Sequence, residues 1–235
     1  MIPWLRPGAP FPPVETALDD PNGLLAASER LEPDRLKEAY RRGIFPWYSE
    51  GQPVLWWSPD PRFVLFVDEF RLARFLAQGR RAAAFRDPRR HGVSHNRDRM
   101  RRDAAPRAGW HVDHAGRCRR LQRAARRGCA HSVEAWREGR LVGGLYGVSM
   151  GRMFFGESMF ACETDASKVA LAHLMAIARA RQIPLVDCQQ ETGHLASLGA
   201  RPIPRAEFAR RVATLVNCAA PEAPWHAPPV EDVLR

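Results

Sequence analysis

The sequence predicts an α+β fold, in which a mixed domain follows a smaller N-terminal module. Helical and strand-like patterns succeed one another in the order helix, strands, hairpin, helix, strand, helix. A strong hairpin pattern lies between residues 141 and 155, where the apolar runs 141–148 and 153–155 flank the turn-like residues 149–152. The 235 residues show no internal repeat and are enough for one large domain or two small ones.

The N-terminal part is expected to begin with an extended lead, followed by a turn and a helix. Five prolines between residues 3 and 13 predict a lead that runs over the surface, and residues 21–23 predict a turn. Pro33 suits the first position of a helix, and Gly43 can end it in a left-handed conformation. The apolar face of this helix is formed by Leu36, Ala39 and Tyr40.

Residues 44–48 and 54–62 form a proline-punctuated aromatic region. It contains three of the seven tryptophans of the chain, Trp47, Trp56 and Trp57. Stiff aromatic side chains of this kind can form a platform on which a nucleic-acid base stacks. A strand is expected next, at residues 63–67, and then a short amphipathic helix at residues 70–78.

Positive charge is concentrated in the middle of the chain. Residues 71–140 contain 20 arginines and 6 acidic residues, a net charge of +14, and the other residues contribute −4 to the total of +10. All the basic residues except Lys37 and Lys168 are arginines, whose planar guanidinium groups suit bidentate phosphate contacts. This distribution indicates a polyanionic partner such as nucleic acid, bound in a salt-sensitive way. The alternative is a coding bias that places solvated arginines where lysines would serve.

Several classes of protein are disfavoured by composition. No run of about 20 apolar residues could span a membrane, and the N-terminus lacks the pattern of a signal peptide, so we expect a cytosolic protein. His111 and His114 are spaced like metal ligands, but no third ligand is placed by spacing, and we expect no metal site. Five cysteines without a CxxC spacing predict free thiols rather than disulfides or a zinc site. They are Cys118, Cys129, Cys162, Cys188 and Cys218.

The hairpin is unusually rich in glycine and ends on a carboxylate. Glycine weakens strands, so this density indicates either a ligand close to the backbone or a bulged, crowded core hairpin. The glycines are Gly143, Gly144, Gly147 and Gly156. Glu157 follows in a partly desolvated place, where a charge needs a partner. That partner is either a cation of a bound molecule or an internal residue such as Arg152.

After the hairpin, the chain is expected to form a helix, a strand and a last helix. Thr164 or Asp165 can cap the first helix. This helix runs from residue 166 to about 181, and the strand follows at residues 184–189. The last helix is expected at residues 207–218, before a proline-rich tail.

Two polar side chains on the expected strand suggest a reaction site. Asp187 and Gln189 would point to one face, because side chains alternate along a strand, and Cys188 would point to the other. Asp187 could then fix and polarise the Gln189 amide, whose carbonyl would accept a hydrogen bond from an incoming amine. The alternative is that Asp187 caps a neighbouring turn and Gln189 faces solvent.

Several rare strings, rich in tryptophan or glycine, occur along the sequence. The N-terminal strings are PNGLL at 21–25, AY at 39–40, GIFPW at 43–47 and LWWSPDPR at 55–62. The C-terminal strings are HSVE at 131–134, LVGGLYG at 141–147, GESMF at 156–160, ASK at 166–168, DCQ at 187–189 and ASLGA at 196–200. In this order, the strings resemble the signatures of the leucyl/phenylalanyl-tRNA–protein transferase family. The resemblance covers most of residues 21–70 and 128–210.

The resemblance implies an aminoacyltransferase of bacterial cytosol. Such an enzyme moves Leu or Phe, with Met left open, from aminoacyl-tRNA to proteins that begin with Arg or Lys, and so marks them for degradation by the N-end rule. The implied fold is a small N-terminal α/β domain at residues 1–62, packed on an N-acetyltransferase-like (GNAT-like) domain at residues 63–235. No ATP, metal or other cofactor is implied, and we expect a monomer that acts away from membranes.

The resemblance also assigns roles to residues of this chain. Asp187 and Gln189 match the catalytic pair, and Glu157 matches a residue that would face the acceptor's N-terminal Arg or Lys. The terminal adenine of tRNA would stack between Trp47 and Trp110, near Tyr40. An apolar pocket for the Leu or Phe side chain matches Leu145, Phe154, Met159 and Leu174. Phosphates of the acceptor stem would meet arginines of the middle tract, with Arg41, Arg42 and Arg62 closer to the platform.

Two stretches depart from the family pattern, at residues 28–31 and 109–127, and the second leaves open an altered selection of tRNA. Two other functions also stay open. A CoA-dependent N-acyltransferase would need a loop that cradles pyrophosphate, and the sequence shows no such loop. A non-enzymatic RNA-binding protein is favoured by the arginine tract alone.

Overall fold

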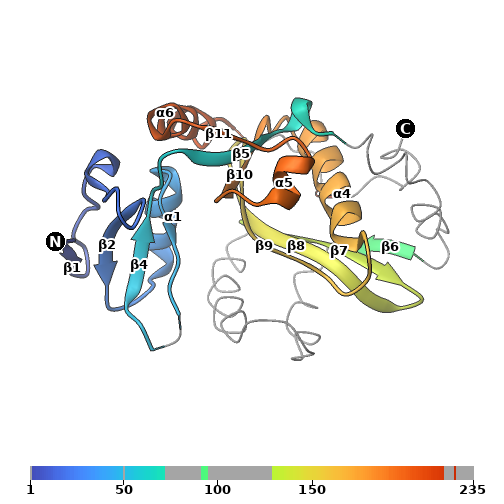
Figure 1. Cartoon of the computed structure of the whole chain (residues 1–235), viewed down its shortest axis with the longest axis horizontal. Coiled ribbons are helices and arrows are strands. Elements are labelled where there is room, and N and C mark those ends of the chain that lie inside the picture. Colours follow the sequence, from blue (N-terminus) through green and yellow to red (C-terminus); the bar gives the residue numbers. More distant parts are fainter. Residues whose placement is uncertain (1, 50, 72–90, 95–128, 220–224, 226–235) are drawn as a thin grey trace.

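The computed structural model describes residues 2–49, 51–71, 91–94, 129–219 and 225. These residues form two β-sheets and several helices (Figure 1). The first sheet has the strand order β1-β2-β4-β3, and the second has the order β11-β5-β10-β9-β8-β7-β6. Parallel and antiparallel pairs occur in both sheets. The structure therefore confirms an α+β fold.

The first sheet and its helix come from the N-terminal part of the chain. The strands are β1 (Trp4–Leu5), β2 (Leu24–Ser28), β3 (Phe45–Pro46) and β4 (Val54–Trp57). Helix α1 spans Pro33–Arg41, with proline at its start as predicted, and Gly43 beyond its end has a φ of 72°. Both ends of this helix were thus predicted correctly, because proline and glycine act on the backbone locally.

The proline-rich lead runs over the surface as predicted, with most of its prolines exposed, but single apolar side chains anchor it to the core. Strand β1 pairs in parallel with β2, and Leu5, Phe11 and Val14 are buried in the core. Two arginines of α1 hold the lead by its carbonyl oxygens: Arg35 donates to Arg6 and Ala9 at 2.9 and 3.0 Å, and Arg42 donates to Phe11 and Pro12 at 2.8 and 3.0 Å. The prolines alone did not indicate these anchors, which bury scattered apolar side chains against the first sheet.

The second sheet contains the long hairpin. Its strands are β5 (Arg62–Phe66), β6 (His91–Ser94), β7 (Ala130–Arg137), β8 (Arg140–Met150), β9 (Met153–Ala161), β10 (Leu185–Gln189) and β11 (Arg201–Ile203). The predicted hairpin is confirmed as β8 and β9, which are longer than expected and joined at residues 151–152. Beyond β5, residues 67–69 form a single 3-10 turn.

Two of the four hairpin glycines are explained by close packing within the chain. A Cβ at Gly143 would lie 2.6 Å from the Cβ of Ala166, at the start of the following helix. A Cβ at Gly147, beside a bulge between β8 and β9, would lie 2.6 Å from the Phe154 ring. The crowded, bulged hairpin is therefore the reading that these two positions support.

After the hairpin, the described residues form the helices α4 (Ala166–Ala180), α5 (Gly193–Ser197) and α6 (Arg205–Leu215). Helix α4 connects β9 to the parallel strand β10 and packs on β7, β8 and β9 (Figure 1). Asp165 precedes α4 as predicted, but its carboxylate pairs with Lys168 at 2.8 Å and makes no capping hydrogen bond. Helix α6 begins and ends a few residues earlier than expected.

The two sheets share one hydrophobic core. Tyr40, Phe45 and Trp56 from the N-terminal part belong to the same cluster as Phe155 and Phe208. A second cluster lies between the large sheet and α4. The shared core fixes α1 against the hairpin, and this packing positions the candidate site.

Several predicted features lie outside the described residues. This applies to most of the expected helix at 70–78, to the possible ligand pair at 111 and 114, and to Trp110. Within the described part of the chain, no helix is long and apolar enough to cross a membrane.

Candidate active site

The candidate site lies where β9 and β10 cease to pair. These parallel strands are in register from Leu185 opposite Met153 to Asp187 opposite Phe155. Beyond that point β9 continues to Ala161, whereas β10 ends at Gln189. Backbone groups that leave a sheet in this way become available to other partners, and polar side chains at strand ends are well placed for binding or catalysis.

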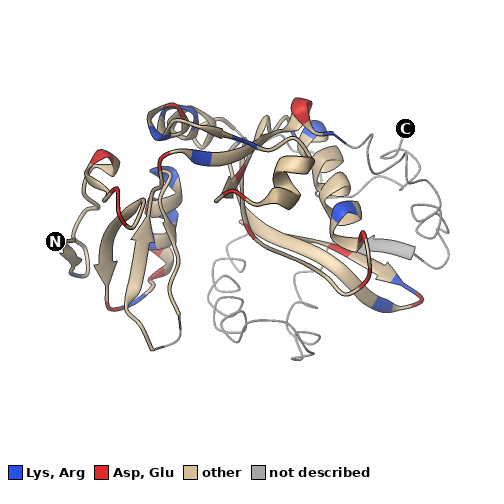
Figure 2. Ribbon diagram, viewed as in Figure 1, with Lys and Arg blue, Asp and Glu red and all other residues tan. Residues whose placement is uncertain are grey.

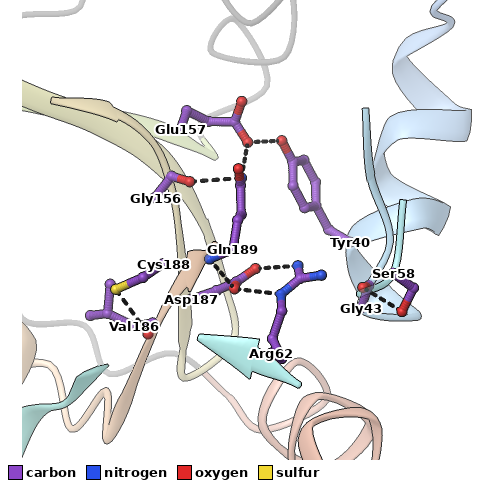
Figure 3. A network of polar contacts seen from close by, with 10 residues as sticks. All are labelled: Tyr40, Gly43, Ser58, Arg62, Gly156, Glu157, Val186, Asp187, Cys188 and Gln189. Atoms are coloured by element: carbon purple, nitrogen blue, oxygen red, sulfur yellow. Dashed lines mark hydrogen bonds and ion pairs between the residues drawn. The ribbon is translucent and has the colours of Figure 1, made fainter. Parts of the chain in front are cut away.

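Asp187 is fully buried and is held by Arg62, the first residue of β5. The guanidinium Nε donates to Oδ1 at 2.8 Å and Nη2 donates to Oδ2 at 2.6 Å, with side chains 1% and 0% exposed (Figure 3). The Arg62 guanidinium also lies 4.5 Å from the ring centroid of Phe45 and 4.6 Å from that of Phe208. Arg62 therefore cannot reach tRNA phosphates from the surface, and the suggestion that it does so was wrong.

Gln189 does not continue the strand geometry that the sequence suggested. The pairing of β10 with β5 shifts register between Asp187 and Gln189, and Gln189 has a left-handed φ of 65°. Its backbone N–H donates to Oδ1 of Asp187 at 2.9 Å. Asp187 thus contacts the backbone of Gln189 rather than its side-chain amide, because the bulge breaks the alternation on which the expectation rested.

The Gln189 amide is directed toward the end of the hairpin. Its Nε2 donates to the carbonyl oxygen of Gly156 at 2.8 Å and to Oε1 of Glu157 at 3.5 Å (Figure 3). Both acceptors lie on the nitrogen side of the amide, which fixes its orientation. Within the described part of the chain, Gln189 Oε1 accepts no hydrogen bond, so this oxygen can accept one from a bound molecule.

Glu157 connects Gln189 to the N-terminal part of the protein. The hydroxyl of Tyr40, on α1, donates a short hydrogen bond to Oε1 of Glu157. The Tyr40 side chain is buried, and its ring lies 4.9 Å from that of Phe155. Arg152 makes no ion pair with Glu157 among the residues that the structure describes, so the internal partner suggested by the sequence is not the one observed.

The environment of Tyr40 keeps its hydroxyl protonated. Burial, and then the carboxylate of Glu157, raise the pKa of Tyr40 well above its ordinary value of 10.0. Tyr40 therefore remains a hydrogen-bond donor at every pH at which the protein works. A permanent donor at Glu157 orients this carboxylate without neutralising it.

Replacing Tyr40 by phenylalanine should lower stability at neutral pH by about 1.5–3 kcal/mol, because a hydrogen bond to a charged acceptor is lost. The folded state binds the Tyr40 proton more tightly than the unfolded state does. This contribution is therefore fully present below about pH 10 and is lost as pH rises through the folded-state pKa. Urea unfolding at pH 7 and pH 11 should show a steeper loss for the wild type than for Tyr40→Phe. Parallel losses would contradict the assignment.

The four expected pocket residues come from β8, β9 and α4 and belong to one hydrophobic cluster. Leu145, Phe154 and Leu174 are buried in the cluster between the sheet and α4, and Met159 packs against it. Phe155, the neighbour of Phe154 on β9, belongs instead to the core shared with the N-terminal part, where its ring lies beside that of Tyr40. A bulge then shifts β9 between Gly156 and Ser158, next to Glu157. Cys188 is partly buried and also packs against the cluster, and this burial raises the pKa of its thiol.

The aromatic region provides one exposed tryptophan. The Trp47 side chain is 46% exposed and its ring lies 5.9 Å from that of Trp57, whose Nε1 donates to the Trp47 carbonyl oxygen at 2.8 Å. Trp56, in contrast, is fully buried and donates to Ser28. The partner expected for Trp47, Trp110, lies outside the described residues.

Most of the arginine-rich tract lies outside the described residues. Of the 20 arginines between residues 71 and 140, only Arg71, Arg137 and Arg140 are described, so 17 lie outside the described residues. In the described part, acidic and basic residues are interspersed mainly on helices, turns and strand ends (Figure 2). The role of the arginine tract toward tRNA therefore stays a prediction.

Sequence reasoning missed two partners of the site. It did not connect Arg62 to Asp187 or Tyr40 to Glu157, which are 125 and 117 residues apart in the chain. One pattern could have indicated the first: an arginine that opens the apolar strand 62–66 is a buried charge, and a buried charge needs a counter-charge. No pattern in the sequence marks the second.

Comparison with known proteins agrees with the sequence and the structure. The family model described as leucyl/phenylalanyl-tRNA protein transferase matches residues 64–213, and the model of the N-terminal domain of that family matches residues 29–60. A solved structure of a conserved protein of unknown function from Bacteroides thetaiotaomicron is 12% identical, with a TM-score of 0.35 over 79% of this chain and 62% of that one, which is too small a likeness to show a shared fold.

Similar proteins named leucyl/phenylalanyl-tRNA–protein transferase occur in several bacteria. That of Bordetella bronchiseptica is 51% identical, over 96% of this chain and 91% of its own length. Those of Paraburkholderia phytofirmans and Thiobacillus denitrificans are 52% and 53% identical, over 96% and 92% of this chain and 94% of their own lengths. The resemblance seen in the sequence strings is thus confirmed, and this chain belongs to the leucyl/phenylalanyl-tRNA–protein transferase family.

Proposed function

We propose that this protein transfers Leu or Phe from aminoacyl-tRNA to the α-amino group of proteins that begin with Arg or Lys. Membership of the family supports the reaction. The observation that supports the mechanism most is the orientation of Gln189, whose amide nitrogen is engaged and whose Oε1 is left as an acceptor beside Glu157. This is the arrangement that a group needs in order to receive a hydrogen bond from an amine.

The reaction is an aminolysis of an ester. The amine nitrogen attacks the carbonyl carbon of the aminoacyl ester, an amide C–N bond forms, and the C–O bond to the tRNA ribose breaks. The amine loses one proton, and the departing ribose oxygen gains one. An ester is already activated and an α-amino group has a pKa near 8, so positioning can supply much of the rate without ATP or metal.

Gln189 would accept a hydrogen bond from the attacking amine through Oε1. This contact aligns the nitrogen lone pair with the carbonyl carbon and draws positive charge away from nitrogen as the C–N bond forms. The amide is a weak base, so its contribution is alignment and polarisation rather than full removal of the proton. The left-handed backbone at Gln189 directs the side chain toward Gly156 and Glu157.

Glu157 would recognise the positive side chain of the acceptor's first residue. Its carboxylate is half-buried and carries hydrogen bonds from Tyr40 and Gln189, which orient it. A guanidinium or ammonium group of the acceptor would be attracted to this carboxylate. Glu157 Oε1 lies 3.5 Å from Gln189 Nε2, so the first residue of an acceptor could contact both side chains.

The aminoacyl-tRNA side of the site is proposed from the remaining residues. Leu145, Phe154, Met159 and Leu174 would contact the Leu or Phe side chain, since they belong to one apolar cluster. Trp47, with its exposed ring, would stack on the terminal adenine together with Trp110. Tyr40 would contribute to the tRNA end of the site indirectly, by holding the carboxylate of Glu157 with its hydroxyl.

We retain two domains, 1–62 and 63–235, and the GNAT-like arrangement of the second as parts of the proposal. The change of sheet between β4 and β5 supports the boundary, and the parting of the parallel strands β9 and β10 supports the arrangement. Cys129, Cys162, Cys188 and Cys218 are free thiols, which fits a reducing cytosol. A monomeric state and a role in N-end rule degradation complete the proposal.

The test is transfer of labelled Leu or Phe from charged tRNA to an Arg-initiated peptide, with EDTA present and ATP omitted. We expect transfer to this peptide and none to the same peptide with an acetylated N-terminus. Absence of transfer with authentic substrates would reject the proposal. Calorimetric binding of acetyl-CoA would instead favour the CoA-dependent acyltransferase.

A further inference from the structure

We infer that Arg62 is a positioning residue of the transfer reaction, which sets the direction of the Gln189 side chain through Asp187. This inference rests on the proposed function and extends it to a residue at the junction of the two sheets. Arg62 opens β5, and its guanidinium contacts the rings of Phe45 in β3 and Phe208 in α6. One guanidinium group thus contacts the N-terminal part, the last helix and the candidate catalytic strand.

The first step is the immobilisation of the Arg62 guanidinium. Aromatic rings lie 4.5 and 4.6 Å from its central carbon, and the side chain is 1% exposed. A planar cation in contact with two rings gains attraction from both and has little freedom to rotate. The direction of its N–H groups is therefore set by the packing of β3 and α6.

The second step passes this direction to Asp187. Two nearly parallel hydrogen bonds, at 2.8 and 2.6 Å, join the guanidinium to both carboxylate oxygens. A bidentate pair fixes the plane of the carboxylate as well as its position, which a single ammonium group would not do. Asp187 is fully buried, so no solvent competes for these bonds.

The third step passes from Asp187 to Gln189. The same Oδ1 that accepts from Arg62 Nε also accepts from the Gln189 N–H, at 2.9 Å. Gln189 has a φ of 65°, a conformation that residues with a side chain adopt rarely and that needs support from its surroundings. This conformation brings Nε2 to Gly156 and Glu157 and leaves Oε1 available.

A second buried arginine shows what a purely structural role looks like and offers a matched control. Arg35 is 6% exposed, lies 5.4 Å from the Phe11 ring, and donates to the carbonyl oxygens of Arg6 and Ala9. It resembles Arg62 in burial and aromatic contact. Its hydrogen bonds, however, hold the proline-rich lead and do not extend to Asp187 or Gln189.

Two variants separate positioning from stability. Arg62→Lys keeps the charge and removes the bidentate contact. The double variant Arg62→Met/Asp187→Leu replaces the buried pair by apolar side chains of similar size, which often leaves a protein as stable as before. We expect each to lower kcat for transfer roughly 10- to 100-fold, because small misplacements of reacting groups are costly, and to change KM for aminoacyl-tRNA much less.

Hydrogen exchange of the Gln189 backbone N–H, followed by NMR, provides a measurement that does not depend on activity. We expect protection of this proton in the wild type and its loss in both variants, whereas Arg35→Lys should keep both the protection and kcat. A double variant with wild-type kcat would overturn the inference, as would unchanged protection in Arg62→Lys. If the double variant does not fold, Arg62→Lys decides. A wild type that transfers nothing would reject the proposed function, yet the exchange experiment would still test the contact.

Discussion

Replacing Gln189 by alanine is expected to lower kcat for aminoacyl transfer by about 10²–10⁴-fold, the range typical for loss of a group that exchanges or accepts a proton in the transition state. The variant removes both the free Oε1 and the hydrogen bonds of Nε2 to Gly156 and Glu157. Binding of charged tRNA should remain, because the proposed contacts to the phosphates and the adenine involve other residues. The measurements are single-turnover transfer and tRNA binding, on the same preparations.

The neighbouring residue provides the control for this prediction. Gln190 is exposed, carries the same side chain, and belongs to the same strand end. Gln190→Ala should therefore transfer at the wild-type rate. Unchanged transfer by Gln189→Ala would remove the proposed mechanism, whereas equal losses in both variants would point to a general disturbance of the end of β10.

Replacing Glu157 by glutamine is expected to reduce kcat/KM for Arg-initiated acceptors roughly 30- to 4000-fold. This factor corresponds to the loss of about 2–5 kcal/mol that is typical when one partner of a desolvated ion pair is removed. Glutamine keeps the volume and can still accept from Tyr40. The loss should depend on the acceptor: a norleucine-initiated peptide, which has no charge to recognise, should react equally with both enzymes. Steady-state kinetics with the two peptides measures this selectivity.

A second carboxylate tests whether the charge must be at this place. Glu163 pairs with Arg137 at 2.6 Å beyond the end of β9, and neither residue contacts Gln189. Glu163→Gln should leave the preference for Arg-initiated peptides intact. The assignment of Glu157 would be wrong if its glutamine variant lost activity toward both peptides to the same extent.

The local elements were largely predictable because their causes lie within a few residues. Proline and glycine set the ends of α1, and the runs of apolar and β-branched side chains marked β8 and β9. Packing contacts were less predictable than the elements themselves. The lead was expected on the surface from its prolines, yet Leu5 and Phe11 are buried because the small first sheet needs them to complete its core.

The candidate site was predictable in its members and not in its contacts. The strings at 156–160 and 187–189 brought Glu157, Asp187 and Gln189 to attention, and the structure places these side chains in one hydrogen-bonded group (Figure 3). The direction of the Asp187 contact was different from the expectation. Strand alternation is a rule for regular backbone, and the left-handed φ at Gln189 is set by a hydrogen bond that no local pattern contains.

The family, the order of the helices and strands, and the residue types that the proposed chemistry uses were predictable from the amino-acid sequence, because each depends on neighbours along the chain. The groups that hold these residues in place became known from the packed fold. Arg62 meets Asp187 across 125 residues because β5 and β10 are adjacent in the sheet, and Tyr40 meets Glu157 because the two sheets share a core. A buried charge requires a partner, and which partner it finds is a property of the packed fold.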